Sequence, residues 1–283
     1  MSVAKVHGKE IGMNIGIIGA ENSHTRHFCQ VFNGEKRHEA YRVTHLYGQD
    51  APETAAALAK EYGLVQAGSE EELIAAVDAV VVTYRKGSQH FAPVMKALRA
   101  GKPVFNDKPF STDAAKAAEI AAYAKEQNLL LCGGSNLKSL PDIKRLKETI
   151  QPGSDITISF AADPGSPYDG YWFYGIHLAE LCVELMGEGF TSVAATRNGS
   201  RVKAEVNYAT GKAQLVTSPD TEELTITVCR DGVETRHDIR MQYESVGPDE
   251  LAAMLASGKP PRAYSSYAAA VRLLADIIQA AGL

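Results

Sequence analysis

Apolar residues are patterned differently in the two halves of the chain. In the first half, continuous apolar runs such as residues 79–83 alternate with stretches of helical periodicity. A continuous run indicates a strand buried on both faces, as in a parallel sheet covered by helices. The expected strands are 14–20, 42–46, 79–83, 101–105 and 129–132, and the expected helices are 23–32, 52–62, 70–77, 91–100 and 112–127, the last capped by Thr112 or Ser111. Repeated strand–helix units predict an α/β fold with a doubly wound parallel sheet of the Rossmann type.

The second half is dominated by alternation of apolar and polar residues. Ile156, Ile158 and Phe160 alternate with polar residues, and residues 202–208 and 224–228 show the same pattern. Such alternation is typical of an antiparallel sheet with one face in solvent. Helical periodicity marks residues 140–150, 174–186 and 264–281. The sequence therefore predicts two domains, a Rossmann domain over 13–133 and an α+β domain over 134–283 with a mostly antiparallel, open-faced sheet.

Composition and charge exclude several classes of partner. A net charge of −5 argues against non-specific nucleic-acid binding, and no apolar stretch is long enough to span a bilayer, so a small-molecule partner is expected. The four cysteines form no CxxC pair, which favours a reducing compartment, and residues 1–12 lack the apolar core of a secretory signal. These features predict a cytoplasmic location.

A candidate dinucleotide turn follows the first expected strand. A turn between strand and helix is where backbone amides hold a pyrophosphate, so residues 19–24 are candidate cofactor ligands: Gly19, Ala20, Glu21, Asn22, Ser23 and His24. If Gly19 is the first glycine of a G-x-G-x-x-G fingerprint, Glu21 and His24 replace the other two. A glutamate beside a pyrophosphate is electrostatically unfavourable. The motif alone leaves a nucleotide site and an ordinary structural turn both open.

The segment after the second expected strand would bind the adenosine ribose. Gln49 or Asp50 could accept its hydroxyls, and the lack of a nearby arginine or lysine favours NAD over NADP. His24 and His27 have a spacing that suits a metal, but no third ligand accompanies them, so no metal site is expected. Three roles remain open for these histidines: contact with pyrophosphate, contact with substrate, and simple helix capping.

The segment Asn106-Asp107-Lys108-Pro109 follows the apolar run 101–105 directly. The carboxyl edge of an open α/β sheet is where ligands bind. The sequence therefore places the Lys108 amine where it can take part in proton chemistry.

Taken together, these features resemble one known family. They are the turn at Gly19, the segment from Thr83 through His90 to residue 93, residues 100–104, Asp107-Lys108-Pro109, the later alternating sheet and residues 256–261. The chain resembles the Gfo/Idh/MocA family (glucose-fructose oxidoreductase, inositol dehydrogenase, rhizopine catabolism) from Met13 to the last expected helix. The resemblance implies a Rossmann domain and an open-faced sheet domain with NAD, or alternatively NADP, and substrate between them. It also implies a homodimer or homotetramer formed through the broad sheet.

The resemblance further implies roles for individual residues. Lys108 would orient the substrate hydroxyl and His177 would act as acid/base, a role that suits histidine because its ordinary pKa lies near neutrality. Glu180 matches a later acid of the same helix, on the face of His177. The cofactor side would include Thr83, His90 and Asp107, and the substrate side Asn136 and Lys138.

The family pattern is altered four residues before His177, where Phe173 stands in place of a frequent aspartate. Asp169 and Tyr174 are the candidates for the missing polar group. Trp172 lies among aromatic residues that either line a substrate pocket or form a hydrophobic wedge between domains. Arg85 and Lys86 either hold an anionic group of the substrate or are solvated loop charges.

The function expected from these observations is NAD(P)-dependent hydride transfer at a hydroxyl or carbonyl carbon of a sugar, a cyclitol or a related small molecule. Two alternatives remain open. One is a lyase or glycosidase-type enzyme that uses NAD without net redox change, and the other is a catalytically degenerate ligand sensor or partner subunit.

Overall fold

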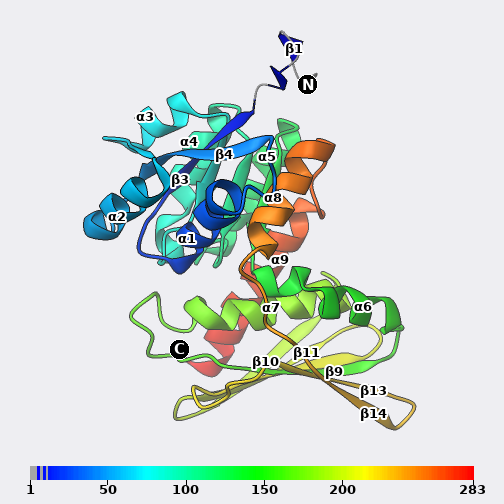
Figure 1. Ribbon diagram of the computed structural model, residues 1–283. Helices are drawn as coiled ribbons and strands as arrows, with labels where there is room; N and C mark the ends of the chain where they lie inside the picture. The colour runs from blue at the N-terminus through cyan, green and yellow to red at the C-terminus, as the bar shows by residue number, and fades with distance from the viewer. Residues whose placement is uncertain (1–4, 7–8, 11) are drawn as a thin grey trace.

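The computed structural model describes residues 5–6, 9–10 and 12–283, and its two sheets lie one above the other (Figure 1). The first sheet is entirely parallel with the order β5-β4-β3-β6-β7-β8. Its strands are β3 (Met13–Ile18), β4 (Tyr41–Tyr47), β5 (Val65–Gln66), β6 (Ala79–Val82), β7 (Val104–Asp107) and β8 (Leu131–Gly134). The order reverses at β3, so the ends of β3 and β6 form the switch point at which ligands of such sheets bind.

Before this sheet, β1 (Lys5–Val6) and β2 (Lys9–Glu10) pair with each other. The expectation that residues 1–12 form no secretory signal lies largely outside the described residues.

Helices cover both faces of the parallel sheet, which explains its continuous apolar strands. They are α1 (Ser23–Cys29), α2 (Pro52–Tyr62), α3 (Glu70–Ala76), α4 (Phe91–Arg99) and α5 (Ala114–Glu126). All four residues of β6 are buried: Val80 and Val82 join the core on one face, and Ala79 and Val81 join the core on the other. The predicted doubly wound sheet is confirmed.

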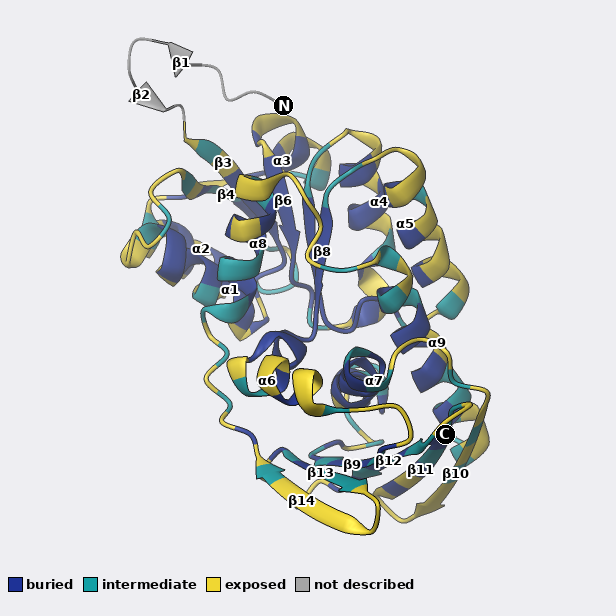
Figure 2. Ribbon diagram, turned by 90° about the vertical axis from the view of Figure 1, so that its right-hand side faces the viewer, coloured by how far each residue is buried: buried dark blue, intermediate teal, exposed yellow. Residues whose placement is uncertain are grey.

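The second sheet has the order β10-β11-β12-β9-β13-β14 and is antiparallel except between β9 and β12. Its strands are β9 (Asp155–Phe160), β10 (Ser192–Asn198), β11 (Arg201–Asn207), β12 (Lys212–Thr217), β13 (Thr225–Arg230) and β14 (Val233–Asp238). One face is buried under α6 (Pro141–Thr149) and α7 (Trp172–Met186), whereas β14 is mostly exposed (Figure 2). The predicted open-faced sheet is confirmed.

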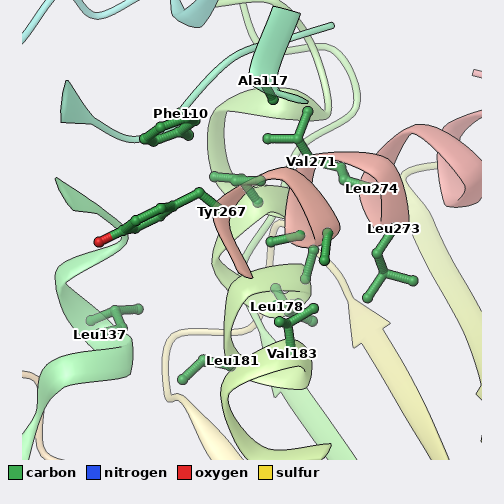
Figure 3. Close-up of a cluster of buried hydrophobic side chains, with 14 of the residues drawn as sticks. Phe110, Ala117, Leu137, Leu178, Leu181, Val183, Tyr267, Val271, Leu273 and Leu274 are labelled. Atoms are coloured by element: carbon green, nitrogen blue, oxygen red, sulfur yellow. The ribbon is translucent and has the colours of Figure 1, made fainter. Parts of the chain in front are cut away.

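The last helix, α9 (Tyr264–Ala281), joins the two layers. It packs against α5 of the first layer and against α7 and β10 of the second. Its Tyr267 stacks on Phe110, with ring centroids 4.8 Å apart and an interplanar angle of 6° (Figure 3). Both rings are almost completely buried, and burying one such ring contributes about 1.5–3 kcal/mol. Because Phe110 lies two residues after Lys108, this stack anchors the loop that carries the lysine.

Several predicted helix ends are wrong by one to three residues, among them those of α5 and α1. The helix expected over 112–127 begins at Ala114, and its cap is Asp113, whose side chain accepts hydrogen bonds from the amides of Ala115 and Lys116. A carboxylate caps at least as well as a hydroxyl and adds a favourable charge to the helix dipole. The helix expected over 23–32 instead ends at Cys29 and continues as a π-helical turn, Gln30–Gly34.

The sequence analysis missed one helix, α8 (Val246–Ser257). It lies beside β8, and its residues Leu251, Ala252 and Met254 enter the core of the first layer together with Ile15. Gly247 and Pro248 near its start obscure the helical pattern. A segment from the second half of the chain therefore covers the Rossmann sheet, and the division at residues 133 and 134 remains a prediction.

Candidate active site

A cavity of about 300 Å³ lies at the carboxyl edge of the parallel sheet. Its walls come from the loops after β3, β6, β7 and β8, from α7, from the end of β9, and from the segment before α8. The lining residues are Glu21, Asn22, Ser23, His24, Arg85, Lys108, Asn136, Leu137, Phe160, Phe173, Tyr174, His177, Met241 and Tyr243. The wall therefore combines aromatic faces with titratable groups.

Lys108 follows β7 directly and is only 5% exposed. Its ammonium nitrogen lies 3.8 Å from the ring centroid of Phe173 and 3.5 Å from the Phe173 carbonyl oxygen. Burial lowers the pKa of Lys108 to about 8, although the neighbouring Asp107 carboxylate opposes this change. A buried amine with such a pKa can hydrogen-bond a hydroxyl and exchange protons near neutral pH.

His177 lies on α7 and is also buried. Its Nδ1 is 2.6 Å from the hydroxyl oxygen of Ser135. Burial holds the pKa of His177 well below its ordinary value, and the charges of Lys108 and His24 act in the same direction. His177 is therefore a neutral imidazole near pH 7.

Glu180 and Lys138 form a buried ion pair that does not line the cavity. The Glu180 carboxylate accepts hydrogen bonds from Lys138 and from the Ser135 amide, and Lys138 also donates to the Gly133 carbonyl oxygen at 2.8 Å. Glu180 thus fixes the loop that carries Ser135, the partner of His177. The structure does not bring Lys138 to the cavity wall, in contrast to its neighbour Asn136.

His24, which lines the cavity, makes a second polar contact with the buried Asp107 carboxylate. The Nδ1 atom of His24 lies 2.8 Å from Asp107 Oδ2 and 3.0 Å from Oδ1. Asn22 donates to the same carboxylate at 2.8 Å. Burial alone would raise the pKa of Asp107, but His24 and Lys108 outweigh it and lower that pKa overall. The fully buried carboxylate is therefore ionised.

The dinucleotide turn makes internal contacts. Gly19 has a φ of +107°, and a Cβ there would lie 2.7 Å from the backbone nitrogen of Tyr84, so this position requires glycine. The amides of Ala20 and Glu21 donate to the Asp50 carboxylate, each at 3.0 Å. The Asp50 side chain, expected to bind ribose, thus contacts the dinucleotide turn, while Gln49 is exposed.

A loop between β9 and α7 lies against this turn. Tyr168 donates to the Glu21 carboxylate at 3.0 Å, and the Arg85 guanidinium lies 4.1 Å from the Tyr168 ring centroid. Asp169 accepts from the amide and hydroxyl of Ser88. Asp169 is thus occupied by Ser88, whereas Tyr174 lies edge-on to His177 with ring centroids 5.3 Å apart.

Three further expected site residues lie behind the cavity wall. The Thr83 hydroxyl bonds to Thr25 at 2.8 Å and to the Gly19 carbonyl oxygen. His90 is fully buried, with its Nε2 2.7 Å from the Tyr84 carbonyl oxygen. Trp172 packs against the hydrophobic core. These positions support the wall rather than face a ligand.

Some lining residues carried no signal in the sequence. Met241 and Tyr243 come from the segment between β14 and α8, which has neither a motif nor a periodic pattern. Ser135 does not line the cavity but contacts His177; it follows the glycine pair that ends β8, and this position after a strand end could have indicated it.

Two kinds of site find no support in the structure. Among its helices, none combines the length and apolar character that a membrane span requires, as far as the described residues show. Within the same part of the chain, no cluster of three or more His, Cys, Asp or Glu side chains is arranged to hold a metal ion.

The Rossmann sheet has polar loops at its carboxyl edge, where ligands of such sheets bind, and it is joined to an open-faced sheet. Residues 13–134 match the model of the oxidoreductase family with an NAD-binding Rossmann fold, GFO_IDH_MocA. Residues 13–134 therefore resemble the NAD-binding domain of the Gfo/Idh/MocA family, and the resemblance seen in the sequence is confirmed over this part of the chain.

Individual relatives support this assignment. Inositol 2-dehydrogenase from Acidiphilium cryptum is 39% identical over 111 residues, which cover 38% of this chain and 32% of that protein. The first curated relatives are matched over 32% to 54% of their length. The solved structure of GenD2 from gentamicin A biosynthesis in complex with NAD has a TM-score of 0.82 at 16% identity, covering 99% of this chain and 97% of that one. UDP-N-acetylglucosamine 3-dehydrogenase from Acidithiobacillus ferrooxidans has a TM-score of 0.74 at 20% identity, covering 96% and 98%. These two likenesses show the fold over almost the whole chain.

The family's cofactor is NAD. At the carboxyl edge of the sheet, the cavity wall fits a dinucleotide, whereas the hydrogen bonds of the turn after β3 conflict with one. The cavity near Lys108 and His177 has the polar and aromatic wall that a nicotinamide and a small substrate require. The Asp50 carboxylate, however, binds the amides of Ala20 and Glu21 that would face a pyrophosphate. The carboxylate and a pyrophosphate compete for these amides, so Asp50 must rotate away wherever they bind the cofactor.

Proposed function

We propose that the protein is an NAD(P)-dependent oxidoreductase that transfers hydride between nicotinamide and a hydroxyl or carbonyl carbon of a sugar, a cyclitol or a related small molecule. The observation that carries the proposal is the Lys108 amine, buried at the carboxyl edge of the Rossmann sheet with a pKa of about 8 and opening onto a cavity. The nicotinamide supplies hydride chemistry, and the chain's own residues bind, orient and deprotonate the substrate.

The cavity wall suits a polyhydroxylated ligand. Lys108 and Asn136 offer hydrogen bonds, whereas the rings of Phe160, Phe173 and Tyr174 offer flat apolar faces. Sugars and cyclitols present both hydroxyls and apolar C–H faces, so they match such a mixture. Lys108 would donate to the reacting hydroxyl oxygen, and His177 would complete its hydrogen bonding.

The first experiment is a titration of the purified protein with NADH and NADPH, followed by nucleotide fluorescence and melting temperature. A ligand bound only by the folded state raises apparent stability. Saturable binding in the micromolar range is expected, tighter for NADH than for NADPH. Absence of binding to either nucleotide would refute the dehydrogenase and favour a ligand sensor.

The second experiment screens polyols, cyclitols and aldoses with NAD⁺ for NADH formation at 340 nm. Any active substrate is then tested with Lys108→Met and with the control Lys86→Met, which removes an exposed charge that does not line the cavity. We expect the first variant to lose at least 100-fold in kcat/KM and the control to stay within threefold. Substrate consumption without net NADH would contradict the proposal and identify the lyase alternative.

Assembly and location belong to the same proposal. The second sheet leaves one broad face partly exposed, which supports a homodimer or homotetramer formed through it. Light scattering coupled to size exclusion tests the oligomeric state, and a monomer at micromolar concentration would refute the proposed assembly.

The cysteines support a cytoplasmic location, because all four are free thiols: Cys29, Cys132, Cys182 and Cys229.

A further inference from the structure

We infer that His24, oriented by Asp107, is the side chain that accepts the proton of the substrate hydroxyl, and that Asp107 is its positioning residue. This inference rests on the proposed function and assigns the proton step within it. The pair joins the first turn of α1 to the end of β7, positions 83 residues apart in the chain.

The contact with Asp107 decides which nitrogen of His24 carries a proton. An ionised carboxylate only accepts hydrogen bonds, so Nδ1 facing both oxygens at 2.8 and 3.0 Å must be the N–H. Asn22 fixes the arrangement from two sides, because its amide nitrogen donates to Asp107 and its amide oxygen accepts from the backbone N–H of His24. The imidazole is thereby held with Nε2 unprotonated.

The Nε2 atom of His24 is available to a ligand. Its ring lines the cavity together with Lys108 and His177, and no hydrogen bond joins Nε2 to another residue that the structure describes. Only a tenth of the side chain is exposed, so a ligand in the cavity replaces water there. This is the geometry of a base aimed at a bound hydroxyl.

His177 is less suited to take up the proton. Its Nδ1 faces the Ser135 hydroxyl, not a carboxylate, and Glu180 one turn further along α7 is paired with Lys138. A proton gained by His177 would lie in a buried site near the positive charge of Lys108. A proton gained by His24 instead faces the Asp107 carboxylate. The aspartate that the sequence lacks at Phe173 is thus replaced by Asp107, which is fully buried behind the cavity wall and contacts His24 there.

The proton step balances with the hydride chemistry of the proposed function. As hydride leaves the substrate carbon for the nicotinamide, the O–H bond breaks, its electron pair forms the carbonyl π bond, and the proton passes to His24 Nε2. The resulting imidazolium returns the proton to solvent, and reduction of a carbonyl reverses each transfer.

Several titratable side chains surround His24. Asp107 and Lys108 approach from β7, His27 lies one turn along α1 with its ring centroid 5.5 Å away, and Tyr243 lies 6.0 Å away edge-on. His177 acts from α7. Among the residues that the structure describes, no carboxylate is hydrogen-bonded to His27, and this histidine does not line the cavity, so it provides a matched control.

The test compares His24→Gln and Asp107→Asn with the control His27→Gln, using a substrate found in the screen. We expect His24→Gln to lower kcat by 100-fold or more with KM changed less than threefold. Asp107→Asn should produce a comparable loss of kcat, because an amide can donate to Nδ1 and move the proton to Nε2. His27→Gln should keep kcat within threefold. Retention of kcat within threefold by His24→Gln would overturn the inference.

A measurement independent of turnover separates this inference from the proposed function. Imidazole ¹⁵N NMR of the wild-type protein should show His24 protonated at Nδ1 and bare at Nε2, and Asp107→Asn should reverse this. A proton found on Nε2 in the wild type overturns the inference whatever the enzyme does. If no polyol, cyclitol or aldose is oxidised, the proposed function itself fails, whereas activity that survives loss of His24 removes only the present assignment. Circular dichroism and nucleotide binding confirm that each variant is folded.

Discussion

Replacing Lys108 by methionine should stabilise the protein at neutral pH while removing its activity. Methionine has similar length and no charge, so it keeps the contact with the Phe173 ring and avoids burying an ammonium. A fall in pKa from 10.5 to about 8 means that the folded state disfavours the charged lysine by about 3 kcal/mol. The face of Phe173 offsets about 1 kcal/mol of this penalty. The variant should gain about 2 kcal/mol at pH 7, or roughly 4 °C in melting temperature.

The pH dependence of this gain has a definite sign. Below pH 8 both folded and unfolded wild-type chains hold the lysine proton, so the whole penalty is present. Between pH 8 and 10.5 the unfolded chain binds more protons than the folded one, and wild-type stability rises with pH relative to the variant. Above pH 10.5 both forms are neutral and the penalty disappears.

The assay is urea unfolding of wild type, Lys108→Met and Lys86→Met at pH 7 and at pH 10. The advantage of Lys108→Met should shrink by more than half between the two pH values, while the exposed Lys86 variant stays within 0.5 kcal/mol of wild type at both. A Lys108→Met protein that is less stable than wild type at pH 7, or whose advantage does not change with pH, would refute the reasoning about desolvation.

Three further predictions concern the residues around the cavity. Glu180→Gln leaves Lys138 charged and buried without its carboxylate partner, so urea unfolding should show that the free energy of unfolding falls by about 3–5 kcal/mol. Adding Lys138→Met should recover most of this loss. A Glu180→Gln protein as stable as wild type would contradict the prediction. Gly133→Ala should give no folded protein by circular dichroism, because Gly133 has a φ of +128° and a Cβ there would overlap the Asn106 carbonyl oxygen. A normal melting curve would show this prediction to be wrong. Asp50→Ala should lower the free energy of unfolding by about 1–3 kcal/mol, because the amides of Ala20 and Glu21 lose their acceptor. The same variant should bind NADH more tightly in the fluorescence titration, since these amides become free. Unchanged affinity would show that they do not contact the cofactor.

The helices and strands followed largely from local patterns. The continuous apolar run of β6 predicted a strand buried on both faces, and the helices Pro52–Tyr62 and Tyr264–Ala281 agree with prediction at both ends. Periodicity is set by neighbouring residues, so a local pattern is enough to reveal it. The predictions failed where a local competitor decided the outcome, as at the Asp113 cap, or where glycine and proline obscured a helix, as in α8.

The candidate site was only partly predictable. The sequence placed Lys108 and His177 because a strand end and a motif mark them, and the structure brings both to one cavity. It could not show that Lys138 turns away to Glu180 or that Asp50 binds the turn amides. Hydrogen-bonding partners distant in sequence leave no periodic pattern.

By itself, the sequence determined the two kinds of sheet, the carboxyl-edge position of Lys108 and the resemblance to the Gfo/Idh/MocA family, since each depends on short stretches of neighbouring residues. Only the tertiary structure decided which charges meet. It joined His24 to Asp107 from α1 and β7, paired Glu180 with Lys138, and buried Lys108 against Phe173. The acid–base properties of a side chain depend on burial and on charges within a few ångströms, and the folded arrangement of distant segments alone sets both.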